Sequence, residues 1–525
     1  MKKFLFFVAL LLPGWLYAQQ PGAALAPGDT THYPLYIPPV VAPTALTLTA
    51  APGTSNLGGT NITTSWTYNN SLPGPSIKAN RGDSVSVLFQ NNLPEESIIH
   101  WHGMLVNTQN DGHPKFAVPA GSSYQYNYKI KNRAALNWYH PHPDMLTGRQ
   151  VYNGLAGAFI INDAEEAALN LPSGNFEIPL VLRDATFDNS GNFKYSATGG
   201  GMFGNTALVN GTIRPYLDVQ RAVYRFRILC GTNARVFNLT LTGGLALRLI
   251  GNDGGLLPVS STQSQITVSS GERLDILIDF RSVPNGTNIL LQDASEGWEL
   301  LQFRVNSPSV INYTGSLSPV SVVVPLANPD TTRTFSFDGM SRINGLQYNM
   351  ERIDWTSRFN HVERWIFISN GNGPHMAHVH GASFQVIARS GGRGQVFAWE
   401  TGWKDVVLVD NNETVTILIR FDEYAGEYLM HCHNLEHGDM GMMANFLVVD
   451  DPGYTWIGVT SDNWFTASNW SGGKVPQATD DVTIGPGDPF PAVIPAATTA
   501  TCRTLTILPG AILTLGSNAH LNVLQ

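Results

Sequence analysis

The stretch from His431 to His433 constrains this chain more than any other, because it places a cysteine between two histidines with no residue to separate them. The preceding residues 427–430 are mixed aromatic and apolar and follow Gly426, a pattern that predicts a β-strand. Successive side chains of a strand point to opposite faces. His431 and His433 are therefore expected on one face of the strand, and Cys432 on the other.

The neighbourhood of Cys432 offers ligands that copper prefers. A thiolate with two imidazoles and a weak axial thioether is the trigonal arrangement of blue-copper electron-transfer sites, and His437 and Met442 follow Cys432 in the chain. His431 and His433 then remain to bind something else one residue away from the thiolate, which would link two metal sites for electron transfer. A lone buried cysteine is usually a small core side chain, but core packing does not explain a His-Cys-His triplet followed by a further His and a Met.

Three more histidine clusters occur on strand-like sequence. Two imidazoles separated by one residue on a strand lie on one face, about 7 Å apart from a rise of about 3.3 Å per residue, which suits neighbouring ions of a metal cluster. Zinc would not need so many imidazoles, whereas clusters of neutral imidazoles suit copper. The pairs are His100 and His102, His140 and His142, His378 and His380, and His431 and His433, and His375 is left to join Cys432, His437 and Met442 in a mononuclear site.

Few histidines lie outside these clusters, so the clustering does not simply reflect a high histidine content. Of the fourteen histidines, those outside the clusters are His32, His113, His361 and His520. We assign no function to His32, His361 or His520, and His113 is interpreted as a turn residue, with a supporting position behind a metal ligand as the alternative.

Short strand-like runs alternate with Gly, Asn and Pro turns as far as about residue 449. Charged residues make up only 14% of the chain and hydrophobic residues 43%, which suits β-rich domains with many turns. Many short strands with regular turns predict an all-β fold of sandwiches or barrels. Residues 164–169 are the one stretch expected to form a short helix. Examples of the strand-like runs are 84–89, 273–280 and 414–419.

Clusters of turn residues divide this region into three units, and a fourth segment follows. The expected units are 30–163, 164–325 and 326–450, with 451–525 as a small C-terminal β-rich segment. The net charge of −9 argues against nucleic acid as a partner.

The first residues predict export. Lys2 and Lys3, the apolar run 4–12 and the small residue Ala18 form a secretory signal peptide over residues 1–18. No later stretch is long and apolar enough to cross a bilayer, so we expect a periplasmic or extracellular protein without a transmembrane segment.

The two cysteines outside the metal motif are expected to stay unpaired. Cys230 lies in a strand-like run and is interpreted as a buried thiol. A bridge to Cys502 would have to join distant segments, so we do not expect a disulfide scaffold.

The combined motifs resemble those of the multicopper oxidase family. They are His-x-His-Gly, His-x-His, His-x-x-His-x-His and His-Cys-His-x-x-x-His-x-x-x-x-Met. The resemblance covers about residues 35–450 and implies three consecutive cupredoxin-like Greek-key β-barrel domains. It is closest in kind to three-domain bacterial laccases, bilirubin oxidases and cuprous oxidases. Further stretches that resemble family landmarks are 81–83, 91–94, 154–157, 208–211, 253–255 and 402–405.

The resemblance implies four copper ions per chain and assigns a ligand set to each. Type 1 copper would be held by His375, Cys432, His437 and Met442, type 2 copper by His100 and His378, and the type 3 pair by His102, His140, His142, His380, His431 and His433.

The resemblance also implies a reaction. A small reducing substrate gives single electrons to type 1 copper through the edge of His437, and four electrons reduce O2 to water at the three-copper cluster. Because that reduction consumes protons, an acid is expected nearby. Asp111 resembles the family's acidic residue, although an ordinary Asp-Gly turn is the alternative. Many bacterial relatives carry Glu after the type 1 His; here that position is Gly438, so Glu436 or Asp439 is left as a substitute.

The substrate class is predicted from methionine content. Cuprous oxidases of the family often have a Met-rich insertion, because thioethers bind Cu(I) well, whereas Met340, Met350 and Met376 are dispersed here. We therefore expect laccase-like oxidation of phenols or aromatic amines. Oxidation of Cu(I) and bilirubin-oxidase-like activity are the alternatives. Copper storage, or a structural cupredoxin module that has lost its ligands, are the non-enzymatic alternatives.

The sequence pattern changes abruptly in residues 451–525. Tryptophan-rich motifs at 454–456 and 463–473 precede short β runs with Gly and Pro turns. This segment loosely resembles the start of a solenoid-like or cell-surface module, whose repeats need neighbours to bury their faces. We expect an appendage for cell-surface attachment or carbohydrate contact, with a spacer as the alternative.

Overall fold

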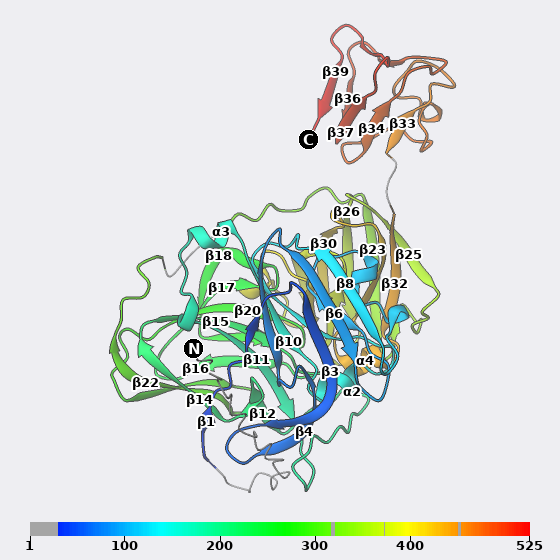
Figure 1. Ribbon diagram of the computed structural model, residues 1–525. Coiled ribbons are helices and arrows are strands. Elements are labelled where there is room, and N and C mark those ends of the chain that lie inside the picture. The colour runs from blue at the N-terminus through cyan, green and yellow to red at the C-terminus, as the bar shows by residue number, and fades with distance from the viewer. Residues whose placement is uncertain (1–29, 317–320, 372, 450–452, 525) are drawn as a thin grey trace, which may run out of the picture.

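The computed structural model describes residues 30–316, 321–371, 373–449 and 453–524. Strands dominate in them, as Figure 1 shows, and three two-sheet units pack into one body beside which a small C-terminal module stands. The predicted all-β fold is confirmed. The predicted signal peptide lies outside the described residues.

The first unit is a β-sandwich. It contains β2 (Val40–Val41), β3 (Leu46–Asn56), β4 (Ile62–Tyr68), β5 (Gly74–Asn80), β6 (Ser84–Asn91), β7 (Ile99–His102), β8 (Ser123–Lys129), β9 (Ala135–Pro141), β10 (Gly157–Asn162), α1 (Thr108–Asp111) and α2 (Thr147–Tyr152). Its sheets have the orders β4-β3-β6-β8 and β2-β5-β10-β9-β7. In β6, Val85, Val87 and Phe89 alternate with the less buried Ser86, Leu88 and Gln90 and enter the core between the sheets, so this run forms a strand with one buried face.

The second unit is a larger β-sandwich. It contains α3 (Ala164–Ala168), β11 (Glu177–Ala185), β12 (Thr206–Val209), β13 (Thr212–Ile213), β14 (Pro215–Arg221), β15 (Val223–Cys230), β16 (Phe237–Leu241), β17 (Leu247–Asn252), β18 (Gly255–Gln263), β19 (Gln265–Val268), β20 (Arg273–Asp279), β21 (Thr287–Asp293) and β22 (Trp298–Ser309). One sheet has the order β13-β12-β11-β15-β20-β17-β18. The other, β14-β22-β21-β16-β19, gains β1 (Tyr33–Pro34) at its edge, so the chain's first described strand pairs with the second unit rather than the first.

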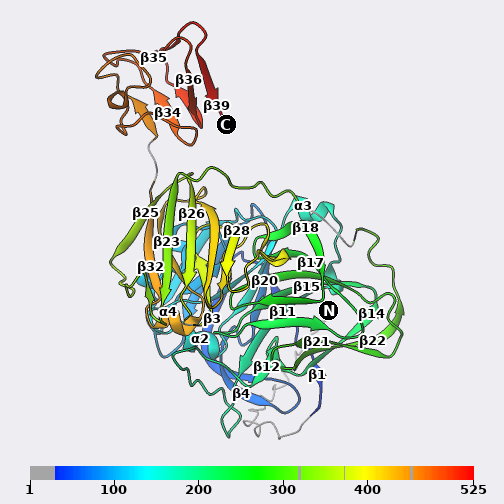
Figure 2. The same cartoon turned by 180° about the vertical axis from the view of Figure 1, so that it is seen from behind.

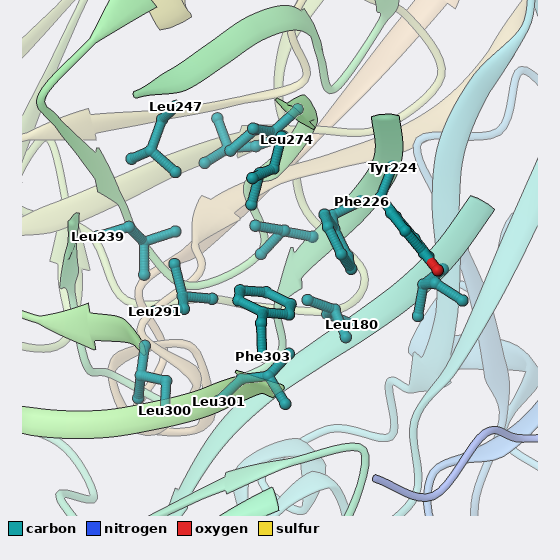
Figure 3. Packing of buried hydrophobic residues seen from close by; sticks show 14 of the residues in the cluster. Leu180, Tyr224, Phe226, Leu239, Leu247, Leu274, Leu291, Leu300, Leu301 and Phe303 are labelled. Carbon is teal, nitrogen blue, oxygen red and sulfur yellow. The ribbon is translucent and has the colours of Figure 1, made fainter. Parts of the chain in front are cut away.

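Leucine and phenylalanine side chains fill the core of the second unit. Figure 3 shows Phe226 and Phe303 facing each other between the two sheets, with Leu180 and Leu291 beside them. Burying each such side chain contributes about 1.5–3 kcal/mol. The predicted short helix at 164–169 is present as α3, where the side chain of Asp163 accepts the backbone N–H of Glu166 and caps the helix.

The third unit repeats the sandwich. It contains β23 (Thr331–Asp338), β24 (Arg342–Ile343), β25 (Ile353–Arg358), β26 (Val362–Ser369), β27 (His375–Val379), β28 (Phe384–Gly391), β29 (Val406–Val409), β30 (Glu413–Arg420), β31 (Gly426–Cys432), α4 (Leu435–Asp439) and β32 (Met443–Val449). Its sheets have the orders β24-β23-β26-β30-β28 and β25-β32-β31-β27-β29. Figure 2 shows this unit from behind, with α4 at its lower end next to α2 of the first unit.

The C-terminal module consists of stacked parallel strands. They are β33 (Tyr454–Trp456), β34 (Asp481–Ile484), β35 (Ala492–Ile494), β36 (Thr499–Cys502), β37 (Thr504–Ile507), β38 (Leu513–Leu515) and β39 (His520–Val523). Parallel ladders join β33-β34-β37, β35-β38 and β36-β39. Successive coils of the chain thus lie on one another, as in a solenoid. Trp456, Trp464 and Trp470 fill the interior at its first end.

The module contacts the third unit through a basic side chain. Arg503 donates from Nη1 to the backbone oxygen of Asn360 at 2.6 Å, beside the point where Figure 1 shows the module standing over β25 and β26. Cys230 and Cys502 are separate buried thiols, as expected. Within the described residues, no helix has the length and apolar character that a membrane crossing needs.

Candidate metal centres

Two pairs of hydrogen-bonded strands place eight histidines at the junction of the first and third units. In the first unit β7 pairs with β9, which sets His100 opposite His140. In the third unit β27 pairs with β31, which sets His378 opposite His431. The two strand pairs meet: Nε2 of His100 lies 3.3 Å from Nε2 of His378, although the two residues are far apart in the chain.

The imidazoles sort into compact groups by the positions of their nitrogen atoms. One group joins His102, His140 and His433, with Nδ1 of His102 at 3.4 Å from Nε2 of His140. A second joins His142, His380 and His431, where the Nε2 of His431 lies 3.2 Å from that of His142 and 3.1 Å from that of His380. His100 and His378 come together beside both groups, with His102 also within reach.

The nitrogen atoms that point away from the cluster are fixed by protein acceptors. Nδ1 of His100 lies 2.6 Å from the backbone oxygen of Asp111, and Nδ1 of His378 lies 2.8 Å from that of Asp405. Nδ1 of His433 lies 3.0 Å from Oγ of Ser270. Such outer partners fix the tautomer and leave the lone pair of the inner nitrogen free for a metal.

The cluster fits metal ions and little else. Burial lowers the pKa of all eight histidines, and for most of them neighbouring imidazoles lower it further, so the rings are neutral. Neutral imidazoles whose lone pairs face one another in a dry interior repel and gain no hydrogen bond. The Nε2 of His433 is buried and has no hydrogen-bond partner among the described residues. Cations bound between these nitrogens would satisfy all of them, and imidazole is a ligand that copper prefers.

A second candidate centre lies on the other face of β31. Sγ of Cys432 lies 3.6 Å from Nδ1 of His375 and 3.7 Å from Nδ1 of His437, and those two nitrogens are 3.3 Å apart. Burial raises the pKa of the Cys432 thiol to about 12, so a metal would have to displace its proton. Met442 is fully buried, and its backbone joins Cys432 and His437 by hydrogen bonds from Cys432 N–H and to the His437 oxygen.

The structure therefore brings together every histidine and cysteine expected at the two centres. The predicted alternation holds: His431 and His433 enter the eight-histidine cluster, whereas Cys432 enters the other centre. His375 and His378, three residues apart on β27, divide between the two centres in the same way.

Comparisons with known proteins agree with this geometry. Models of multicopper oxidase domains match residues 49–166 and 320–452. A laccase of Bacillus stratosphericus is 31% identical over 72% of this chain and 89% of its own length. The chain belongs to the multicopper oxidase family. A bilirubin oxidase of Albifimbria verrucaria is 31% identical over 74% of this chain and 73% of its own length.

Solved structures agree on the fold. The multicopper oxidase McoA from Aquifex aeolicus is 36% identical, covers 80% of this chain and 99% of its own, and superimposes with a TM-score of 0.74. Members of this family are copper-dependent oxidoreductases that use O2, and copper is the cofactor of this chain. Residues 455–525 match a domain of unknown function.

In this multicopper oxidase, Asp111 contacts two of the clustered histidines. Its Oδ2 accepts a hydrogen bond from Nδ1 of His380 at 2.7 Å, and its backbone oxygen accepts one from His100. Its Oδ1 is buried without a partner among the described residues, and burial raises the pKa of the carboxyl group well above its usual range. Burial thus favours the protonated form of this carboxyl group, which lies in direct contact with the cluster.

Glu436 is an anchor rather than a free acid. Its carboxylate accepts hydrogen bonds from Asn233 Nδ2 at 2.6 Å, from Tyr195 Oη at 3.1 Å and from the backbone N–H of Met202 at 2.9 Å. These three partners come from the second unit, so Glu436 fastens α4 to that unit.

Asp439 and Gly438 lie close to the histidine cluster. The Asp439 carboxylate accepts the backbone N–H groups of Thr147 and Gly148 at 2.9 and 2.8 Å, and burial raises its pKa to about 8. A cavity of about 10 Å³ lies between Gly438, Asp439, His142 and His431, with space for roughly one water molecule.

A cluster of buried charged side chains lies behind His102 and was not predicted from the sequence. Nε2 of His102 lies 3.1 Å from Oδ1 of Asp405, which also accepts from Nη1 of Arg273 at 2.6 Å. Lys404 pairs with Asp253 at 2.9 Å in the same buried group. The available signal was a Lys-Asp pair immediately before the buried run Val406–Val409, since charges are rarely buried without partners.

His113 is a turn residue, as interpreted from the sequence. Its Nδ1 accepts the backbone N–H of Lys115 at the start of a short 3-10 helix, and its Nε2 lies 3.0 Å from Oδ1 of Asn445. His32 lies 2.5 Å from a carboxylate oxygen of Glu299 on the second unit, away from both centres.

Proposed function

We propose that this multicopper oxidase is laccase-like: it oxidises phenolic or aromatic amine donors by one electron each at the Cys432 centre and reduces O2 to water at the eight-histidine cluster. The observation that carries the proposal is the triplet from His431 to His433, whose consecutive side chains enter two different centres. Copper ions bound in these centres would supply the one-electron redox chemistry and the binding of O2. A single stretch of β31 then joins donor oxidation to O2 reduction, so the organic donor and O2 need not meet.

We assign the ligands as four copper ions per chain. His375, Cys432, His437 and Met442 hold type 1 copper; His100 and His378 hold type 2 copper; His102, His140 and His433, and His142, His380 and His431, hold the two type 3 ions. The facing nitrogen atoms of each group support this assignment. Asp111 holds a proton at Oδ1, the carboxyl oxygen that accepts no hydrogen bond from His380, for delivery to the cluster.

Spectra and oxygen uptake test this proposal together. Copper-loaded protein should bind four copper ions, show the thiolate-to-copper charge-transfer band, and consume O2 with a simple phenol. A Cys432→Ser variant should lose the charge-transfer band and oxidation of the phenol while keeping ions at the histidine cluster. If the Cys432→Ser protein kept the band, Cys432 would not be a copper ligand and the proposal would fall.

Oxidation of Cu(I) is the second candidate. Met145, Met340 and Met440 are 70%, 38% and 38% exposed, and thioethers bind Cu(I). Met440 directly follows α4, which carries His437. Comparing the initial rates of O2 uptake with Cu(I) and with a phenol at equal concentration decides between the candidates: a faster rate with the phenol supports the laccase-like function.

We further propose export, with cleavage after Ala18, and a periplasmic or extracellular location. N-terminal sequencing of protein secreted or released from the periplasm should begin at Gln19. The domain boundaries proposed are 30–163, 164–325, 326–450 and 451–525, each following a change from one sandwich or stack to the next.

The C-terminal module is proposed to attach the protein to a surface or to contact carbohydrate. The hydrogen bond from Arg503 to the backbone oxygen of Asn360 joins this module to the oxidase body. Protein truncated at Asp450 should therefore load copper and oxidise phenol normally while losing retention on cell-wall or polysaccharide fractions. Loss of copper loading would contradict the role of an appendage.

A further inference from the structure

The type 1 histidine is covered by a loop of the second unit. His437 is only 2% exposed, and the backbone of Gly199 lies against its ring. Nδ1 of His437 faces Cys432 and His375, so Nε2 is the outward nitrogen, and it lies 3.3 Å from Nδ2 of Asn434. The edge of the imidazole that would otherwise meet a donor is therefore occupied by protein.

Hydrogen bonds hold this cover loop, residues 195–202, against α4. Thr198 and Gly201 exchange backbone hydrogen bonds at 3.1 and 3.0 Å, which closes the loop into a tight turn. Nδ2 of Asn434 donates to the Gly200 oxygen at 3.0 Å. At the two ends of the loop, Tyr195 Oη and the Met202 N–H both donate to Glu436. The anchoring role of Glu436 thus acts on the loop that covers His437.

Met340 lies against the top of the cover loop. A Cβ atom at Gly199 would stand 2.9 Å from Sδ of Met340, and one at Gly201, where φ is +123°, would stand 2.5 Å from the Cβ atom of Ala234. Met340 is 38% exposed, and Gly199 is exposed as well. The Met340 thioether and the Gly199 backbone therefore both belong to the outer surface of the loop that covers the His437 ring.

We propose that the donor of this oxidase docks on Met340 and the cover loop rather than on His437, and that Met340 determines which donors are accepted. The inference rests on the proposed function and names the surface that its substrate uses. The donor is oxidised by one electron and the type 1 copper is reduced by one. No covalent bond forms between donor and protein. The electron crosses the cover loop that separates the donor from the His437 ring.

The exposed thioether favours an aromatic donor. Sulfur atoms of methionine make favourable contacts with aromatic rings at about 5 Å, and phenols and aromatic amines present such rings. The cover also keeps bulky donors from direct contact with the imidazole. Affinity for the donor should therefore depend on Met340, whereas the rate from the bound state should depend on the unaltered Gly199 and His437.

Accessibility of His437 tests the cover without any turnover. Copper-free protein is treated with diethyl pyrocarbonate, and the modified histidines are mapped by peptide mass spectrometry. His520, which is exposed, should react readily, and His437 should react at least about tenfold more slowly. Tyr195→Phe, which removes one hydrogen bond of the loop, should raise the rate at His437 while leaving that at His520 unchanged. Equal rates at the two histidines of unaltered protein would overturn the cover.

Kinetics test the docking surface on copper-loaded protein. Met340→Ala should raise KM for a phenol about 2- to 10-fold with little change in kcat, because a sulfur–aromatic contact is lost. Met340→Leu, which keeps the volume, should show a similar rise. Met145→Leu removes an exposed thioether elsewhere and should leave KM unchanged. An unchanged KM in both Met340 variants would overturn the proposal, as would an equal rise in Met145→Leu.

The two tests also separate this inference from the proposed function. If unaltered copper-loaded protein did not oxidise phenols at all, the proposed donor class would be wrong. A protected His437 would still establish the cover loop, and the Met340 variants would then be compared with Cu(I) as donor. If phenols were oxidised but His437 were readily modified, only the docking surface would be wrong.

Discussion

Nε2 of His102 points at Asp405, at 3.1 Å from Oδ1, and this makes His102 the exception in its cluster. The other seven clustered histidines turn Nε2 inward, but His102 turns Nδ1 toward His140. Asp405 is held in place by Arg273, which is fully buried. A buried ion pair of the second and third units thus sets the orientation of a histidine in the first.

We predict that Asp405→Asn lowers the free energy of unfolding by about 3–5 kcal/mol, because it removes the hydrogen-bonded carboxylate of the buried Arg273 and leaves only the longer ion pair to Asp253 at 3.7 Å. It should also weaken metal binding at the His102 group about 10- to 100-fold, since the outer partner of that ring is impaired. Urea unfolding and copper titration measure the two effects. Asp422→Asn, which breaks a partly exposed pair with Arg420, should cost at most about 1 kcal/mol. A loss below that value for Asp405→Asn would contradict the argument.

Asp111→Asn should slow O2 reduction about 10²- to 10⁴-fold, the range expected on removing a positioned acid. Burial raises the pKa of Asp111, so the unaltered carboxyl is protonated at low pH and loses its proton as pH rises through that raised pKa. The rate of O2 reduction by unaltered protein should therefore fall as pH rises. The Asp111→Asn variant should not show this pH-dependent decrease. Stopped-flow reoxidation measures this step, and anaerobic reduction by the donor should be unchanged. Identical pH profiles would refute the role.

Copper-free protein should lose stability as pH falls below about 6.5. Burial lowers the pKa of His140 to about 3 and that of His431 to about 4 in the folded state, whereas unfolded histidine titrates near 6.5. The unfolded chain therefore binds more protons between these values, so stability is present above pH 6.5 and is lost as pH falls. Each such histidine adds a slope of up to about 1.4 kcal/mol per pH unit.

Urea unfolding of the copper-free protein between pH 5 and 8 checks this slope. His140→Gln should reduce it, because one buried titrating ring is removed. His520→Gln, at an exposed position, should leave it unchanged. Stability that did not vary between pH 5 and 6.5 would count against neutral buried imidazoles.

Gly438→Glu should restore part of the O2 reduction lost in Asp111→Asn. A Cβ atom at Gly438 would make only an ordinary van der Waals contact, at 3.5 Å from the Cys432 oxygen. The new carboxyl would lie beside the small cavity at His142 and His431. Replacing glycine within α4 should also stabilise the helix by about 0.5–1 kcal/mol. Gly438→Gln, which has the same length but no acid, should not rescue the reaction, and equal rescue by both variants would rule out proton donation.

Much of the fold could be predicted because its signals are local. Strands such as β6, β20 and β30 were expected from alternating or continuous apolar runs, and each is present, β6 and β30 with slightly wider bounds and β20 one residue shorter. Strand pairing was harder to predict: β1 pairs with β14 of the second unit although its residues lie in the range predicted for the first unit. Strand pairing depends on which apolar faces meet in three dimensions, and two residues of sequence carry no such information.

The sequence by itself determined the ligand types and their division between two faces, because alternation along a strand is a property of the backbone. The tertiary structure decided which histidines face one another, how Asp405 orients His102, and that Glu436 anchors a loop rather than serving as a free acid. It also decided that Met340, which is distant from the other methionines in the sequence, lies against Gly199 in the loop that covers His437. These contacts join residues of different units, so they exist only once the packed units bury them together.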